Sequence, residues 1–159
     1  MKQELLQLGN GAHALALQIL GNPDDAADAV HDSFAVALQK PDVFDASKGP
    51  LRPWFLRVVR NRCIDLLRRR REQESGIDEL THQSADPEQA LQFEQRDEDI
   101  HLAMARLGSE QRQIIVLRDF MDLSYAEIAA VLDIALGTVM SRLHRARLAL
   151  RKELSQHDD

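Results

Sequence analysis

The sequence predicts an all-α protein with two small helical domains joined by a flexible acidic linker, the second ending in a helix-turn-helix. Aromatic residues make up only 4% of the 159 residues, so Leu, Ile, Val and Ala must build the core. Apolar residues recur at three- and four-residue steps along most of the chain. That period is lost over residues 73–88, which are polar and acidic and contain Gly and Pro. We therefore expect domains at residues 1–72 and 89–159.

The first domain is predicted to contain three helices. The apolar spacing over the first 20 residues indicates one helix, interrupted near Gly9 and Gly11. A second helix begins at Asn22, a capping residue followed by Pro and two Asp, and it ends before Pro41. A loop rich in Pro, Gly, Asp and Ser covers residues 41–53 and leads into a long third helix.

The second domain is predicted to contain four helices, at about residues 88–106, 109–120, 124–132 and 137–154. Ser109 and Ser124 are expected to cap two of them. Ser124 and Glu127 have the spacing of a capping box, which marks the start of the third of these helices.

The net charge of −6 argues by itself against a nucleic-acid partner, but the charge is unevenly distributed. Residues 51–72 contain eight Arg and two acidic residues, a local charge of +6. Residues 137–152 contain four Arg, one Lys and no acidic residue, a local charge of +5. Local potential governs the approach to phosphate, so both stretches are candidate nucleic-acid surfaces. The alternative for either stretch is a solvated helix face.

The sequence gives little indication of an enzyme, and we expect no catalytic residue, cofactor or metal site. The six His are scattered, and no Gly-rich phosphate loop is present. The single Cys63 lies on the apolar stripe of the third helix, which favours a core position over a reactive thiol. No apolar run approaches the roughly 20 residues of a membrane span, and the N-terminus lacks the features of a signal peptide. A cytoplasmic protein without membrane insertion is expected.

The segment from Leu123 to Leu154 has the pattern of a helix-turn-helix. A short apolar helix, a turn beginning at Asp133 and a longer basic helix opening at Gly137 follow one another. The basic helix is expected to enter a major groove, where Arg contacts guanine or phosphate and hydroxyls contact phosphate. The predicted DNA-contacting residues are Thr138, Met140, Ser141, Arg142, His144, Arg145 and Arg147.

This segment, LSYAEIAAVLDIALGTVMSRLHRARLALRKEL, resembles the promoter-recognition region of extracytoplasmic-function (ECF, group IV) RNA polymerase sigma factors. The family pattern runs close to LSYxEIAxxLxIxxGTVxSRLxRARxxLRxxL. LGSEQRQIIVLRDFMDLS resembles the region that precedes it. Met140 departs from the pattern, because the family often has Lys there. The resemblance implies that this domain, sigma region 4, recognises the upstream promoter element as duplex DNA.

The N-terminal half resembles sigma region 2. GNPDDAADAVHDSFAVAL is similar to the family helix that binds the clamp coiled coil of the polymerase largest subunit, with departures at Ala27 and His31. The resemblance implies that core polymerase is bound by Asp28, His31, Asp32 and Phe34.

WFLRVVRNRCIDLLRRRR is similar to the family helix that, with the loop before it, melts the downstream promoter element and captures unpaired bases. For Asn61 and Asp65, pairing with neighbouring Arg on the helix surface is the alternative. Trp54 is expected in the core rather than as a stacking platform. The residues that the resemblance implies for downstream DNA are Lys48, Arg52, Asn61, Arg62, Asp65, Arg68 and Arg69.

The resemblance implies a sigma factor that directs promoter-specific initiation and is not an enzyme. Its expected partners are core RNA polymerase, promoter DNA and an anti-sigma factor. One alternative is a plain helix-turn-helix repressor or activator, which leaves the N-terminal basic helix unexplained. Another is a sigma-like protein that binds polymerase or a regulator without starting transcription, for which Ala27, His31 and Met140 are the only support.

Overall fold

The computed structural model describes residues 2–74 and 95–157, and every regular element in these two ranges is helical. The predicted linker over residues 73–88 lies outside the described residues except for its first two. The N-terminal elements are α1 (Lys2–Gln7), α2 (Gly9–Leu20), α3 (Pro23–Gln39), η1 (Pro41–Val43), η2 (Ala46–Lys48) and α4 (Leu51–Gln73). The C-terminal elements are α5 (Gln95–Ala105), α6 (Ser109–Ile115), η3 (Val116–Phe120), α7 (Tyr125–Leu132) and α8 (Leu136–His157).

The starts and stops of the N-terminal helices follow from local sequence. The predicted interruption of the first helix lies between α1 and α2, at Leu8. Gly21 ends α2 with a left-handed backbone at φ 75°, which glycine adopts without steric cost. The Asn22 side chain then accepts hydrogen bonds from the backbone amides of Asp24 at 2.8 Å and Asp25 at 3.1 Å. This cap confirms the predicted start of α3.

The C-terminal helices form the predicted helix-turn-helix, α7 followed by α8. The capping box of Ser124 and Glu127 is present at the start of α7. Asp133, left-handed at φ 57°, ends α7 and opens the turn. The prediction that Ser109 caps a helix is wrong: Gly108 takes the cap position, and the Ser109 hydroxyl instead donates to the Gln18 carbonyl of α2 at 3.2 Å.

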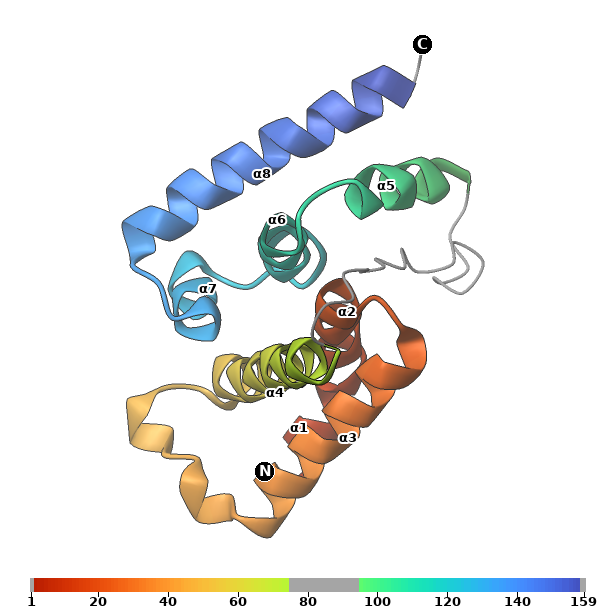
Figure 1. Cartoon of the computed structure of the whole chain (residues 1–159). Coiled ribbons are helices and arrows are strands. Elements are labelled where there is room, and N and C mark those ends of the chain that lie inside the picture. The colour runs from red at the N-terminus through yellow and green to blue at the C-terminus, as the bar shows by residue number, and fades with distance from the viewer. Residues whose placement is uncertain (1, 75–94, 158–159) are drawn as a thin grey trace.

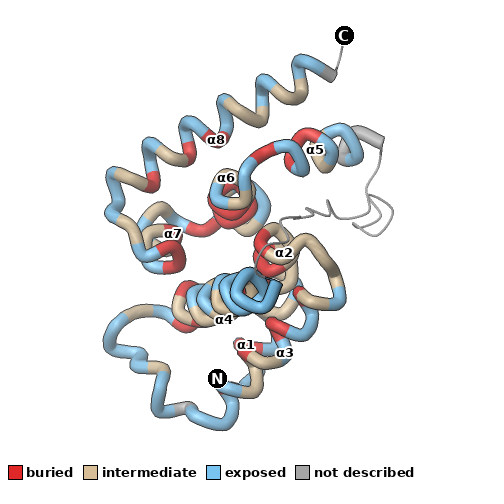
Figure 2. Tube along the Cα trace, viewed as in Figure 1, coloured by how far each residue is buried: buried red, intermediate tan, exposed pale blue. Residues whose placement is uncertain are grey.

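The two halves of the chain pack against each other along α4 (Figure 1). α4 contacts α2 and α3 on one side and α7 on the other, while α6 also contacts α2. Buried residues concentrate where α2, α4, α6 and α7 meet, whereas exposed positions alternate with more buried ones along α8 (Figure 2). Cys63 is fully buried in this core, and burial raises the pKa of its thiol to about 12. The predicted core position of Cys63 is therefore confirmed.

Candidate nucleic-acid interface

The N-terminal half of α8 presents one polar face to solvent. Val139, Leu143 and Ala146 are buried against the rest of the domain, so the opposite side of the helix is free for a ligand. Within the helix, the Ser141 hydroxyl donates to the Thr138 carbonyl at 3.2 Å, and Arg145 Nε donates to the Ser141 carbonyl at 3.4 Å. The predicted residues that are exposed on this side are Met140, Ser141, His144 and Arg145.

Two predicted DNA-contacting arginines lie at the edges of this face. Arg147 binds Asp119 of η3 with both Nε, at 3.2 Å, and Nη2, at 2.5 Å, and this pairing raises the pKa of the Arg147 guanidinium. Arg142 is half-buried and lines a surface cavity of about 200 Å³ together with Glu110, Gln111, Ile114 and Arg145. Both guanidinium groups therefore lie beside the exposed face, that of Arg147 held by a carboxylate and that of Arg142 lining the cavity.

The second candidate surface is formed by α4 and the loop before it. Lys48, Asn61, Arg68 and Arg69 are exposed. Arg52, in contrast, reaches across to the C-terminal half, where its Nη2 lies 3.1 Å and 3.3 Å from the two carboxylate oxygens of Glu127.

Asp65 is the centre of a local cluster of ion pairs on α4. Its carboxylate lies 2.5 Å from Arg68, 3.2 Å from Arg69 and 3.6 Å from Arg62. These are pairs at helix spacing, the arrangement given above as the alternative for Asp65. Asp65 therefore orients three arginines and offsets part of their charge.

Trp54 packs against the hydrophobic core while remaining half-buried. Its ring lies against that of Phe44, with 5.0 Å between the centroids and an interplanar angle of 52°. Phe44 comes from the loop before α4, so this aromatic pair ties the loop to the helix. This ring contact holds the loop beside the basic face of α4.

Comparisons with known proteins identify both halves of the chain. The family described as "Sigma-70 region 2" matches residues 6–73, and "Sigma-70, region 4" matches residues 97–150. The chain is 32% identical to the ECF RNA polymerase sigma factor SigW of Bacillus subtilis over 154 residues, covering 89% of this chain and 82% of SigW. This chain belongs to the ECF RNA polymerase sigma factors.

Two further relatives agree with this assignment. The ECF sigma factor SigE of Mycolicibacterium smegmatis is 32% identical over 156 residues, which are 95% of this chain but only 60% of SigE. The solved structure of the sigma factor RpoE of Bartonella quintana, in complex with the anti-sigma factor NepR, superposes with a TM-score of 0.79 at 29% identity. That match covers 97% of this chain and 96% of RpoE. Sigma factors are non-enzymatic subunits of RNA polymerase, and regions 2 and 4 recognise promoters.

The residues expected to bind polymerase in this sigma factor do not share one environment. Asp28 and His31 are exposed on α3. Asp32 is half-buried and accepts hydrogen bonds from Arg62 of α4, from Nε at 3.3 Å and Nη2 at 3.0 Å. Phe34 is half-buried, with its ring centroid 4.9 Å from that of Phe55. Asp28 and His31 are therefore accessible to a partner, whereas Asp32 and Phe34 contribute to the packing of α3 on α4.

The sequence did not reveal the polar contacts between the two sigma domains. Arg60 Nε of α4 donates to Gln113 Oε1 of α6 at 2.7 Å, and Arg112 Nη2 of α6 donates to the Gln18 carbonyl at 3.0 Å. Burial lowers the pKa of Arg60, and nearby Arg142 lowers it further while Glu110 opposes the shift. In the sequence, the one indication of these polar contacts was Gln113, a polar residue directly before an apolar run.

Within residues 2–74 and 95–157 of this sigma factor, no helix combines the length and apolarity that a bilayer-spanning helix needs. The same described residues contain no cluster of three or more His, Cys, Asp or Glu arranged to hold a metal ion.

Proposed function

We propose that this chain binds core RNA polymerase in the cytoplasm and directs initiation at a specific set of promoters. α8 recognises the upstream element as duplex DNA, and α4 with its preceding loop melts and holds the downstream element. The observation that carries the proposal is the exposed polar face of α8, where Ser141, His144 and Arg145 stand opposite a buried apolar side.

The residues proposed for each contact are drawn from those that the helix pattern and the family resemblance indicated. Ser141, Arg142 and Arg145 of α8 contact the upstream duplex. Lys48, Arg68 and Arg69 neutralise phosphates of the downstream element, and Asn61 is free to hydrogen-bond an unpaired base. Strand separation is driven by binding energy, because a captured base repays part of its lost stacking.

The polymerase contact is proposed for the exposed side of α3. Asp28 and His31 make direct contacts, and Asp32 takes part while it also orients Arg62. Phe34 contributes by packing on Phe55, which holds α3 in a fixed orientation and so keeps Asp28 and His31 in place for the polymerase.

We also propose an anti-sigma partner for this chain, because the similar RpoE of Bartonella quintana was solved with the anti-sigma factor NepR. This anti-sigma factor should bind the free sigma factor, and it should lower the transcript yield when both proteins are present in the transcription assay.

The experiment is run-off transcription with purified core polymerase on fragments of the source genome. Specific transcripts are expected with the wild type, and at least tenfold fewer with the Arg142→Ala/Arg145→Ala double variant, because each good arginine contact contributes about 1–3 kcal/mol. Arg106→Ala is the matched control: it removes an exposed arginine that directly follows α5 and that the proposal does not use. If the protein fails to bind core polymerase yet retards duplex DNA alone, a simple helix-turn-helix regulator replaces the proposed sigma function.

A further inference from the structure

Two large apolar side chains are exposed at the start of α8. Leu136 is 51% exposed and Met140 is 54% exposed, whereas Val139 and Leu143 of the same helix are buried in the core. Leu136 and Met140 are four residues apart, so they are neighbours on one side of the helix. A single exposed apolar residue is ordinary on a protein surface, but here two of them form a small apolar patch.

This apolar patch belongs to the face of α8 that is proposed for DNA. Ser141 and Arg145 are exposed beside it, and the half-buried Arg142 lies at the edge of the same face. Residues 137–152 carry a local charge of +5, so the partner of this face should be an anion. Because region 4 recognises promoters, we take that anion to be duplex DNA.

The backbone beside the patch is open to close approach. Among the described residues, no atom lies within 4 Å of a Cβ built at Gly137. Gly137 is also not one of the glycines with positive φ, so neither packing nor a left-handed backbone explains a glycine there. Gly137 precedes Met140 by three residues and shares its side of the helix. The missing side chain leaves room for a base edge next to Met140.

We propose that Met140 determines part of the promoter specificity of this sigma factor, by packing on the 5-methyl group of a thymine in the upstream element. Base pairs display hydrogen-bond donors and acceptors in the major groove, and the thymine methyl is the apolar group among them. A methionine side chain has no donor and only a weak acceptor, so it suits a methyl group. The inference rests on the proposed function of α8 and adds to it the chemical group that the helix selects.

The preference for thymine follows from what Met140 would otherwise face. A thymine methyl packed on Met140 and Leu136 removes apolar surface from water on both partners. Cytosine lacks the methyl and presents its amino group instead, and a polar group covered by an apolar side chain loses its hydrogen bond to water.

The test uses a promoter found by run-off transcription and replaces each thymine of its upstream element in turn with deoxyuridine, which lacks only the 5-methyl group. With core polymerase and limiting wild-type sigma factor, replacement at one thymine or two adjacent ones should lower the transcript yield about fourfold, the effect of one buried methyl. Met140→Ala should lower the yield from the unmodified promoter by a similar factor. Deoxyuridine at the same positions should then lower it little further, as expected of two partners in one contact.

Leu148→Ala is the matched control, because it removes another exposed apolar side chain of α8, two turns beyond Met140. This variant should remain as sensitive to deoxyuridine as the wild type, and both variants should keep the helical circular dichroism.

The inference is overturned if no deoxyuridine changes the wild-type yield, or if Met140→Ala remains as sensitive to deoxyuridine as the wild type. Either result, obtained with transcripts present, leaves the proposed function intact. An absence of transcripts from every template would instead overturn the proposed function and, with it, this inference.

Discussion

The arginines of this sigma factor fall into two groups according to their partners. Arg68, Arg69 and Arg145 are exposed and bond within their own helices, Arg68 and Arg69 to Asp65 and Arg145 to the Ser141 carbonyl. Arg52, Arg62 and Arg147 each bind a carboxylate from another element, respectively Glu127, Asp32 and Asp119. Partly exposed ion pairs contribute little to stability, so a phosphate can displace such a carboxylate at small cost. We expect these three carboxylates to hold the arginine side chains in place until a phosphate replaces them.

Glu127 leads to a prediction about pH. Partial burial raises the pKa of its carboxyl, but the hydrogen bond from the Ser124 amide and the pairing with Arg52 together lower it below its usual value. A lowered pKa in the folded state means that Glu127 contributes stability above the unfolded pKa of about 4.3, and that this contribution is lost as the pH falls through the folded value.

We therefore expect Glu127→Gln to lower the free energy of unfolding near neutral pH by about 1 kcal/mol or less, given the partial exposure of the pair. The difference from wild type should persist in mildly acidic solution and shrink only as the pH falls below about 4.3 and through the lowered folded pKa, where the wild-type carboxyl becomes protonated. Urea denaturation at neutral and at acidic pH measures this difference in the free energy of unfolding. A difference that stays constant down to acidic pH would contradict the assigned cause.

At the scale of elements, the turn between α7 and α8 sets the angle of the DNA-recognition helix. Asp133 ends α7 with φ 57° and ψ 50°, and its backbone amide donates to the Ala129 carbonyl. The Ile134 amide donates to the same carbonyl at 3.1 Å, which closes the last turn of α7. Residues other than Gly, Asn and Asp rarely adopt this left-handed backbone conformation, so the turn depends on which residue occupies position 133.

The turn can be tested with a matched pair of substitutions. Asp133→Ala and Asp133→Gly both remove the exposed 3.5 Å ion pair with Arg57, but only Ala adds steric strain at positive φ. We expect Asp133→Ala to be about 1 kcal/mol less stable than Asp133→Gly, measured by urea denaturation. Equal stability of the two variants would show that the left-handed backbone is not maintained.

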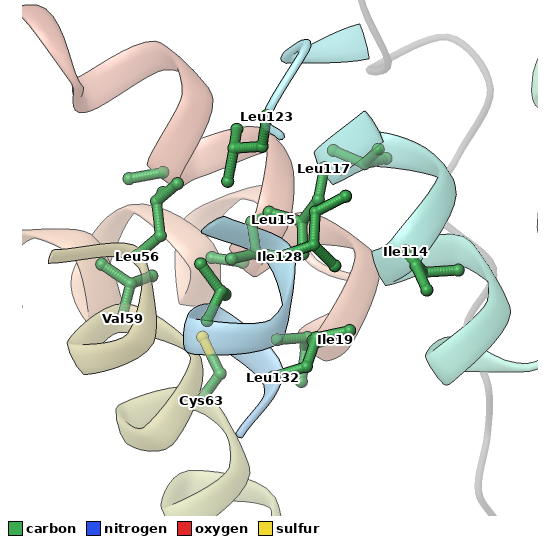
Figure 3. Packing of buried hydrophobic residues seen from close by; sticks show 14 of the residues in the cluster. Leu15, Ile19, Leu56, Val59, Cys63, Ile114, Leu117, Leu123, Ile128 and Leu132 are labelled. Atoms are coloured by element: carbon green, nitrogen blue, oxygen red, sulfur yellow. The ribbon is translucent and has the colours of Figure 1, made fainter. Parts of the chain in front are cut away.

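At the scale of the whole molecule, regions 2 and 4 share one hydrophobic core although family comparison treats them as separate regions. Leu15 and Val59 from region 2 belong to the same buried cluster as Leu117 and Ile128 from region 4 (Figure 3). Because the two domains bury each other's apolar surface, they are expected to unfold together. Trp54, the only tryptophan, reports on region 2, whereas far-ultraviolet circular dichroism reports on all helices.

Substitution at Gly11 should break this cooperativity. Gly11→Leu improves helix propensity in α2 but must displace the flexible end of the Met121 side chain, and we expect this overpacking to cost about 1 kcal/mol, the low end of the usual range. The urea transitions followed by Trp54 fluorescence and by circular dichroism should coincide in the wild type and separate in Gly11→Leu. Adding Met121→Ala makes room and should bring the two transitions back together. If the two transitions remain as far apart in the double variant as in Gly11→Leu, the contact between position 11 and Met121 is not the cause.

The sequence by itself determined the helices and their ends, because caps and apolar periods act over a few residues. Asn22 and the Ser124–Glu127 box marked two helix starts, and the stripe through Phe55 and Cys63 located the buried side of α4. The residues of the exposed α8 face, such as Ser141 and Arg145, followed from the same periodicity. Family resemblance added the expectation of promoter recognition, which the comparisons bear out.

Only the tertiary structure decided which partners these residues have. Arg52, which the family resemblance implies for DNA, pairs with Glu127, 75 residues away, while Ser109 was expected to cap α6 and instead bonds to Gln18. Pairing across such separations depends on how whole helices pack, and periodicity within one helix carries no information about which other helix will cover its face.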